Sequence, residues 1–295
     1  MSVEKIQTSA EPKATFTFRH TSTYHYTGPV EFGRHRVVMR PRESHYQRLE
    51  SMTLETNPKS EIHWSEDIFG NMIALVDFSE ASKVLSFSST ITVRRTPPPE
   101  GFEEGIQVKR PVHYRGIEES ATFPYRQSTY PLEVASVRNW LKSQNVRSSD
   151  NDSSPLFDDL AALIKQEIGY QRREEPGVQP PQKTLRLGTG SCRDTAVLMM
   201  ESARAMGFAA RFVSGYMESA NSKVARGSTH AWTEIYLPAK GWVGYDPSIG
   251  KRIGLGHISV GVSNHPRGVM PISGTFSGNG QSFSRLEVSI SSERQ

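Results

Sequence analysis

Alternation of apolar and polar residues from position 14 to position 95 is the feature that most constrains the fold of this chain. Successive side chains of a strand point to opposite faces, so a period of two indicates strands with one buried face. The segments that carry it are rich in β-branched and aromatic residues: ATFTFRH, HRVVMR, MTLETN, MIALVDF and VLSFSSTITVRR. Turn-forming residues separate these segments at 27–29, 57–60 and 69–71. The pattern predicts an antiparallel β module of about six or seven strands over residues 14–96.

The chain changes character at TPPPEG, residues 96–101. Residues 97–130 contain several prolines and glycines and show no clear period, so we expect a linker there. Residues 1–13 are polar and are expected to be disordered. Helical spacing begins at residue 131, and residues 131–295 are therefore expected to form a second domain.

Three segments of this second domain carry apolar residues at helical spacing: 131–143, 153–168 and about 192–206. Ser154 is a candidate N-cap of the second helix, and Gly207 is placed to end the third. The intervening residues 169–190 are expected to form a loop. Strand candidates follow at 209–217, 230–237, 241–246, 257–262 and 285–290. Strands followed by helices and then by more strands predict an α+β fold.

Cys192 is the only cysteine of the chain and lies at the start of the third predicted helix. The unpaired backbone N–H groups and the positive end of the helix dipole both favour a thiolate there. Gly190 would let the backbone approach a bound carbonyl closely. A free cysteine is also commonly a small buried hydrophobic residue, so packing and nucleophilic roles both stay open at this point.

The segment STHAWTEIYLPAKGWVGYDPS, residues 228–248, offers a base and a group to orient it. A hairpin with the loop 238–240 would place Trp232 opposite Asp246 and make His230 a diagonal neighbour of Asp246 on the same face. A slip of one residue would remove Asp246 from that face. Taken alone, each of these residues is more often structural, since an aspartate before proline commonly forms a turn.

Taken together, these segments resemble the transglutaminase-like superfamily of papain-like cysteine enzymes. The resemblance is carried by GTGSCRDTAV opening a helix, by the THAWTEIYL strand and by GWVGYDPS, in the family's order and at family-like spacing. The first module, with HTSTYHYTGPVEFGRHRVVMRPRE and DIFGN, resembles the N-terminal region of the bacterial branch of this family. The two resemblances cover roughly residues 14–290.

The resemblance implies a papain-like core, in which a helix carrying Cys192 packs on an antiparallel sheet carrying His230 and Asp246. It implies that Cys192 is the nucleophile, His230 the general base and acid, and Asp246 the orienting group. Attack on an amide or acyl carbonyl would form a thioester. Water would then release an acid, and an amine would give a new amide.

Neighbouring residues are assigned supporting roles on the same basis. The backbone N–H of Cys192 would contribute to an oxyanion hole, with Gly190 beside it and Gln182 as a candidate side-chain donor. Trp232 is a candidate substrate contact and, with Trp242, a candidate aromatic wall. Asp194 is read as a first-turn carboxylate that compensates the helix dipole, with a structural role only.

Three functions follow from these residues. We expect a peptidase or amidase-type hydrolase acting on a protein or peptide substrate with an amide group. A protein-glutamine acyltransferase shares the same chemistry and differs only in whether an amine or water reaches the thioester. The third, from a different class, is a non-catalytic peptide-binding module. The segment SNHPRGVMP, residues 263–271, departs from the Gly-Arg-Asp-like segment of bacterial relatives, which leaves the substrate open.

Composition argues against several other classes. The net charge of +4 is small for 295 residues, and the basic segment RHRVVMRPR alternates like a strand, so no nucleic-acid partner is expected. His20 and His25 are close in sequence but lack a cysteine or carboxylate cluster, so neither a metal nor another cofactor is expected. No acidic loop resembles an EF-hand, which disfavours a calcium-dependent enzyme.

The sequence also bears on the compartment. No apolar run approaches the ~20 residues that span a bilayer, so no membrane association is expected. The start, MSVEKIQTSAEPK, has no apolar core and does not read as a signal peptide. A single cysteine fits a reducing compartment, and we expect a cytoplasmic location. The oligomeric state stays open.

Overall fold

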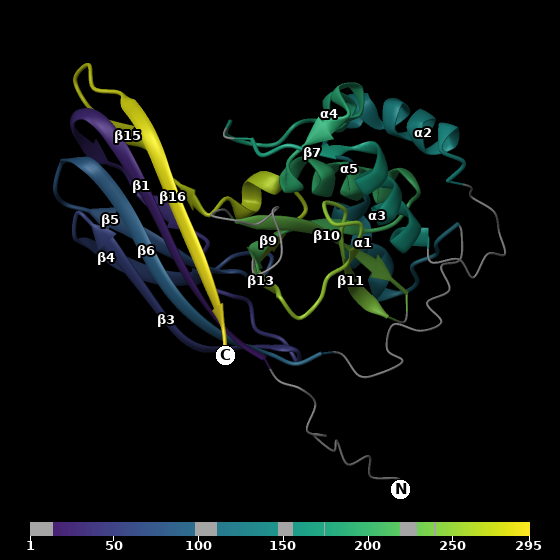
Figure 1. Cartoon of the computed structure of the whole chain (residues 1–295), viewed down its shortest axis with the longest axis horizontal. Coiled ribbons are helices and arrows are strands. Elements are labelled where there is room, and N and C mark those ends of the chain that lie inside the picture. Colours follow the sequence, from purple (N-terminus) through teal and green to yellow (C-terminus); the bar gives the residue numbers. More distant parts are fainter. Residues whose placement is uncertain (1–13, 98–110, 147–155, 174, 219–228, 239) are drawn as a thin grey trace, which may run out of the picture.

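The computed structural model describes residues 14–97, 111–146, 156–173, 175–218, 229–238 and 240–295 (Figure 1). Its α+β architecture confirms the predicted fold class. A unit built of antiparallel strands lies on the left of Figure 1, and a unit of helices around a second antiparallel sheet lies on the right. The predicted disorder of residues 1–13 lies outside the described residues, as does Ser154, the candidate N-cap.

Two sheets packed face to face form the β module. One sheet has the order β16-β1-β6-β3, with β15 also pairing β1, and the other has the order β14-β2-β5-β4. The strands are β1 (Ala14–Phe32), β2 (His35–Val37), β3 (Gln47–Asn57), β4 (Ser60–Glu66), β5 (Met72–Phe78) and β6 (Ser82–Arg95). The apolar faces that the alternation predicted meet between the sheets, where Phe32, Met39 and Phe87 are buried.

The C-terminal strands β14 (Ile272–Ser273), β15 (Phe276–Ser277) and β16 (Phe283–Arg294) belong to the β module. β16 pairs with β1 from Phe16 to Tyr26, and Figure 1 shows the two strands running together. This corrects the expected boundary, because residues 131–295 do not form one unit. A strand pairs with any available edge, and the edge of β1 is adjacent in space although it is distant in sequence.

The second unit is built on a sheet of order β12-β11-β10-β9-β13. Its strands are β9 (Ala210–Met217), β10 (His230–Leu237), β11 (Gly241–Asp246), β12 (Lys251–Arg252) and β13 (His257–Ser263). Helix α5 (Cys192–Ala205) packs on β10 and β9 and carries much of the largest core cluster. Helices α2 (Val134–Ser143) and α3 (Leu156–Glu167) cover α5. The three predicted helices are thus confirmed, and Gly207 ends α5 with a φ of 92° as expected.

Aromatic residues join the two units. Phe16 and Phe18 of β1 share a buried cluster with Tyr216 of β9 and Ile258 of β13. The rings of Phe18 and Tyr216 are stacked with centroids 5.1 Å apart. Nδ1 of His20 and the hydroxyl of Tyr216 form a buried hydrogen bond of 3.0 Å. The sheet that carries the predicted site residues is therefore anchored to the β module.

Some local predictions are wrong. The turn expected at 27–29 is absorbed within β1 as a register shift between His25 and Val30. β4 was not predicted because most of its residues are exposed and polar. The expected linker contains helix α1 (Ile117–Arg126), which buries only Thr122 and so shows little apolar period. The expected loop 169–190 contains the short strands β7 (Gly169–Tyr170) and β8 (Thr189–Gly190) and the helix α4 (Pro181–Leu187).

No helix within the described residues is long and apolar enough to cross a membrane. A short 3-10 turn, η1 (Pro131–Glu133), precedes α2, and another, η2 (Pro266–Val269), follows β13. The second of these lies in the segment that departs from the bacterial relatives' pattern.

Removing residues 281–295 should lower the melting temperature by about 10 °C or more, because β1 would lose its pairing with β16 and expose that edge. The measurement is thermal unfolding followed by circular dichroism. The control is Glu287→Ala on the same strand, an exposed residue whose ion pairs with His25 and Arg285 are superficial, and it should shift melting by about 2 °C or less. Equal melting of the truncated and full chains would contradict the assignment of β16 to the β module.

Candidate active site

Cys192 begins helix α5, as the sequence predicted, and its side chain is only 5% exposed. Ser191 is the N-cap residue, with an extended backbone. The carboxylate of Asp194 accepts hydrogen bonds from the backbone N–H and the hydroxyl of Ser191, both at 2.8 Å. This arrangement fixes the first turn, where backbone N–H groups lack helical partners. The cysteine sulfur is therefore held at the positive end of a helix.

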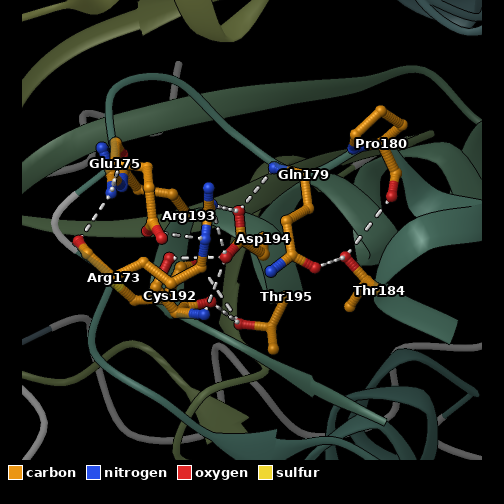
Figure 2. A network of polar contacts seen from close by, with 10 residues as sticks. Arg173, Glu175, Gln179, Pro180, Thr184, Cys192, Arg193, Asp194 and Thr195 are labelled. Carbon is orange, nitrogen blue, oxygen red and sulfur yellow. Dashed lines mark hydrogen bonds and ion pairs between the residues drawn. The ribbon is translucent and has the colours of Figure 1, made fainter. Parts of the chain in front are cut away.

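Asp194 also ties the preceding segment to the helix, as Figure 2 shows. Its Oδ1 accepts the backbone N–H of Gln179 at 2.7 Å and a guanidinium N–H of Arg173 at 2.9 Å. Asp194 is fully buried, and the side chain of Arg173 is 12% exposed, so this is a buried ion pair. The predicted structural role of Asp194 is thus larger than compensation of a dipole, because the carboxylate holds Arg173 and Gln179 against the start of α5.

Glycine at position 190 is required for the same packing. A Cβ at Gly190 would come within 2.9 Å of the Asp194 Cβ, closer than carbon atoms normally approach. Gly190 also pairs with Tyr170 in the parallel β7–β8 ladder. The strand therefore brings Tyr170 to the segment that leads into Cys192.

His230 and Asp246 meet as the predicted register requires. β10 and β11 pair with Leu237 opposite Gly241 and Thr233 opposite Tyr245, which continues the ladder predicted from the loop 238–240. Nε2 of His230 donates to Oδ2 of Asp246 at 2.6 Å, and both side chains are fully buried. Nδ1 of His230 is buried and has no hydrogen-bond partner among the described residues. Cys192 is close enough to the imidazole to raise its pKa.

The Asp246 carboxylate receives three further hydrogen bonds. Oδ1 accepts the backbone N–H and the hydroxyl of Ser248, at 2.9 and 2.6 Å. Oδ2 accepts a second imidazole, Nε2 of His257, at 3.1 Å. A buried carboxylate with four donors is stabilised in its ionised form. The Asp246 carboxylate is thus fixed in place.

The electrostatics of the pair follow from this geometry. Burial lowers the pKa of His230, but attraction to Asp246 and Cys192 and the hydrogen bond to Asp246 outweigh it and raise the pKa to about 10. Burial raises the pKa of Asp246, and His230 and His257 together lower it well below its usual range. Burial and then the charge of Cys192 raise the pKa of Tyr170 to about 12, so its hydroxyl stays protonated. Both shifts favour the charged forms of His230 and Asp246.

Two residues predicted to contact the substrate or the oxyanion do not have side chains exposed at the site. Trp232 is fully buried, with its ring against His257 at 5.4 Å and His230 at 6.3 Å, so it packs the histidines and has no surface to offer a substrate. Gln182 is exposed on α4, and its backbone N–H donates to Glu133. We therefore withdraw the substrate contact for Trp232 and the oxyanion-hole role for Gln182. Gln179, three residues earlier, is buried instead, and its backbone N–H donates to Asp194 of α5.

Sequence reasoning missed His257, Ser248 and Arg173. Ser248 could have been found, because a serine two residues after an aspartate commonly bonds back to it. His257 gave no local signal. It reaches Asp246 from β13, which is separated from β10 by β9 in the sheet. His230, Asp246 and His257 are also the one group of potential metal ligands within 4.8 Å of one another among the described residues, and hydrogen bonds already join them.

Comparison with known proteins gives matches over both units. Residues 16–94 match the bacterial transglutaminase-like N-terminal region, and residues 141–247 match the transglutaminase-like superfamily. An uncharacterized protein from Mycobacterium tuberculosis is 25% identical over 288 residues, covering 92% of this chain and 90% of that protein. An uncharacterized protein from Mycobacterium leprae is 23% identical over 277 residues, covering 92% and 96%.

Among solved structures, a putative cysteine protease from Cytophaga hutchinsonii aligns with a TM-score of 0.71 at 18% identity. The alignment covers 95% of this chain and 91% of that chain. The likeness therefore extends over the β module and the helical unit together, and it shows a shared fold.

Asp194→Ala should lower the free energy of unfolding by about 3–5 kcal/mol, because it removes the buried partner of Arg173 and leaves this guanidinium only the exposed Glu175 carboxylate at 3.5 Å. The measurement is urea unfolding. The matched control is Asp158→Ala, which breaks the partly exposed ion pair with Arg252 and should cost about 1 kcal/mol or less. Similar losses in the two variants would show that Asp194 does not hold the loop to the helix.

Proposed function

Because this chain belongs to the transglutaminase-like superfamily, we propose that it is a cysteine-dependent enzyme acting on amide bonds. Cys192 is the nucleophile, His230 the general acid and base, and Asp246 the orienting carboxylate. We propose hydrolysis as the reaction, so that the enzyme is of the peptidase or amidase type. The substrate class is a protein or peptide that carries an accessible amide.

One observation carries this proposal: Asp246 binds His230 through Nε2, while the buried Nδ1 has no hydrogen-bond partner among the described residues and Cys192 is close enough to raise the pKa of the imidazole. We infer that Nδ1 faces the Cys192 sulfur. A base fixed on one side by a carboxylate and facing a nucleophile on the other is the arrangement that covalent catalysis requires. An imidazolium beside the sulfur and the helix N-terminus around it both favour a negative charge on that sulfur. Packing alone would not need a charged, fully buried pair.

Acylation follows from these positions. The Cys192 thiolate attacks the amide carbonyl carbon, forming a carbon–sulfur bond and moving the carbonyl electrons onto oxygen. The backbone N–H of Cys192 stabilises that oxyanion, since N–H groups of a helix's first turn have no helical partner. The imidazolium of His230 gives its Nδ1 proton to the leaving nitrogen as the carbon–nitrogen bond breaks. The products are an amine and a thioester on Cys192.

Deacylation reverses the roles of the same groups. Neutral His230 takes a proton from water at Nδ1, the resulting hydroxyl attacks the thioester, and the thiolate leaves with an acid released. An amine in place of water would give a new amide instead. The predicted aromatic wall for an amine is weakened by the burial of Trp232, while Trp242 packs against Tyr125, Tyr236 and Arg211. This is our reason for preferring hydrolysis over acyl transfer.

The compartment belongs to the same proposal. A single free cysteine that must stay reduced to react fits the cytoplasm, and we retain that location. Neither a metal nor a cofactor takes part in the proposed steps.

Cys192→Ala, His230→Ala and Asp246→Ala should each abolish turnover of an amide substrate, with the loss smallest for Asp246→Ala. Losses of about 10³-fold or more are expected for the nucleophile and the base, whereas the rings of His257 and Trp232, which pack beside His230, would hold it partly in place without Asp246. Turnover is measured as acid release. In the wild type, intact mass after rapid acid quenching should show the acyl group on Cys192.

The control for these variants is His25→Ala, which removes a histidine on β1 that pairs with Glu287 outside the site. Its turnover should equal that of the wild type. Unchanged turnover in His230→Ala would overturn the assignment of the base, and release of a new amide in the presence of an amine would favour acyl transfer.

A further inference from the structure

We propose that His257 is a positioning residue for the Cys192 reaction, which clamps the Asp246 carboxylate and keeps it ionised beneath His230. This inference rests on the proposed function, since it assigns a second histidine to the same catalytic group. His257 need not contact the substrate. It is separated from Cys192 by Asp246 and His230 and acts through them.

The geometry is a shared acceptor. Oδ2 of Asp246 accepts from Nε2 of His230 at 2.6 Å and from Nε2 of His257 at 3.1 Å. Both imidazoles are buried, at 1% and 5% exposure. One oxygen thus receives two ring N–H groups from different strands, β10 and β13.

The protonation of His257 is set by its other nitrogen. The backbone N–H of Gly254 donates to Nδ1 of His257 at 3.1 Å, so Nδ1 presents its lone pair and the proton is on Nε2. The backbone N–H of His257 donates in return to the carbonyl of Gly254 at 3.0 Å. His257 is therefore a neutral donor with a fixed tautomer, aimed at the carboxylate.

Packing holds this imidazole in register. The Trp232 ring meets His257 edge to face, with an angle of 85° between the ring planes. Gly215 of β9 makes room for that ring, because a Cβ there would come within 2.7 Å of the Trp232 Cη2 atom. Ser248 completes the clamp on Oδ1. With all four acceptor positions filled, the carboxylate has no alternative partner toward which it can rotate.

The charged and titratable groups around the carboxylate come from each neighbouring element. His230 of β10 and His257 of β13 contact Asp246. Cys192 of α5 raises the pKa of His230, and burial and the charges of Cys192 and Asp246 raise the pKa of Tyr170 on β7. Without His257, Asp246 would lose one donor to its ionised form and part of its fixed orientation. The imidazolium of His230 would then be less stabilised, and so would the thiolate opposite it.

The first test uses the wild-type protein and no substrate. Nitrogen-15 NMR of histidine-labelled protein at pH 7 reports which ring nitrogen carries the proton. His257 is expected to show protonated Nε2 and unprotonated Nδ1. A proton on Nδ1 and none on Nε2 would overturn the proposal, because Nε2 would then present a lone pair to the carboxylate.

The second test compares His257→Phe with His257→Gln. Phenylalanine keeps the ring packing against Trp232 but removes the donor, while glutamine can return an N–H to the position of Nε2. The readout is the pH window over which iodoacetamide alkylates Cys192, followed by mass spectrometry. In His257→Phe, the acid end of this window should move up by about one pH unit, and the alkylation rate at pH 6 should fall by about tenfold. His257→Gln should restore most of the window and most of the rate.

A wild-type window in His257→Phe would reduce His257 to a packing residue. A narrowed window in both variants would likewise count against the donor role. Circular dichroism reports whether each variant is folded, and the NMR test still decides the proposal if His257→Phe does not fold. Failure of the proposed function would appear differently, as a wild-type Cys192 that shows no enhanced reactivity while the His257 tautomer is as expected.

Discussion

The buried contact between His230 and Asp246 is the interaction on which the rest of this structure depends. A carboxylate taken out of water is costly unless each lone pair finds a donor, and Asp246 finds four. The raised pKa of His230 contributes stability that is fully present below its ordinary value and is lost as the pH rises through about 10. The lowered pKa of Asp246 contributes stability that is present above its ordinary value and is lost as the pH falls. The pair is therefore charged throughout the neutral range.

Two buried aspartates hold different parts of the site in place. Asp246 binds His230, which it would orient in the proposed mechanism, and Asp194 fixes the start of α5, where Cys192 lies, by bonding to Ser191, Gln179 and Arg173. The β module packs against the sheet that carries His230 and Asp246, since the phenylalanines of β1 contact β9 and β13. The β module and the helical unit thus form one continuous support for a small number of buried polar groups.

Much of the site was predictable because it is local in sequence. Periodicity placed Cys192 at the start of a helix, and the short loop 238–240 determined which residues of β10 and β11 face each other. His257 and the final strand were not predictable in the same way. Each depends on which strands become neighbours, since β13 pairs with β9 and β16 pairs with β1, which are distant in sequence.

The errors at Trp232 and Gln182 have physical reasons too. Alternation correctly assigned Trp232 to the face of His230, but it cannot say whether that face is covered, and here the tryptophan is fully buried. The prolines before Gln182 suggested a loop, whereas Pro181 occupies the first turn of α4, where a proline is well tolerated. The helix then carries Gln182 to the surface.

The most direct measurement is the rate at which iodoacetamide alkylates Cys192 as a function of pH, in the wild type and in His230→Ala. The chain has one cysteine, so the mass change has a single source. We predict rapid labelling of the folded wild type well below the pH at which a free thiol ionises, and an advantage over His230→Ala that disappears as the pH rises through about 10. Labelling only after unfolding, or identical profiles for the two proteins, would contradict the claim that His230 and Asp246 activate Cys192.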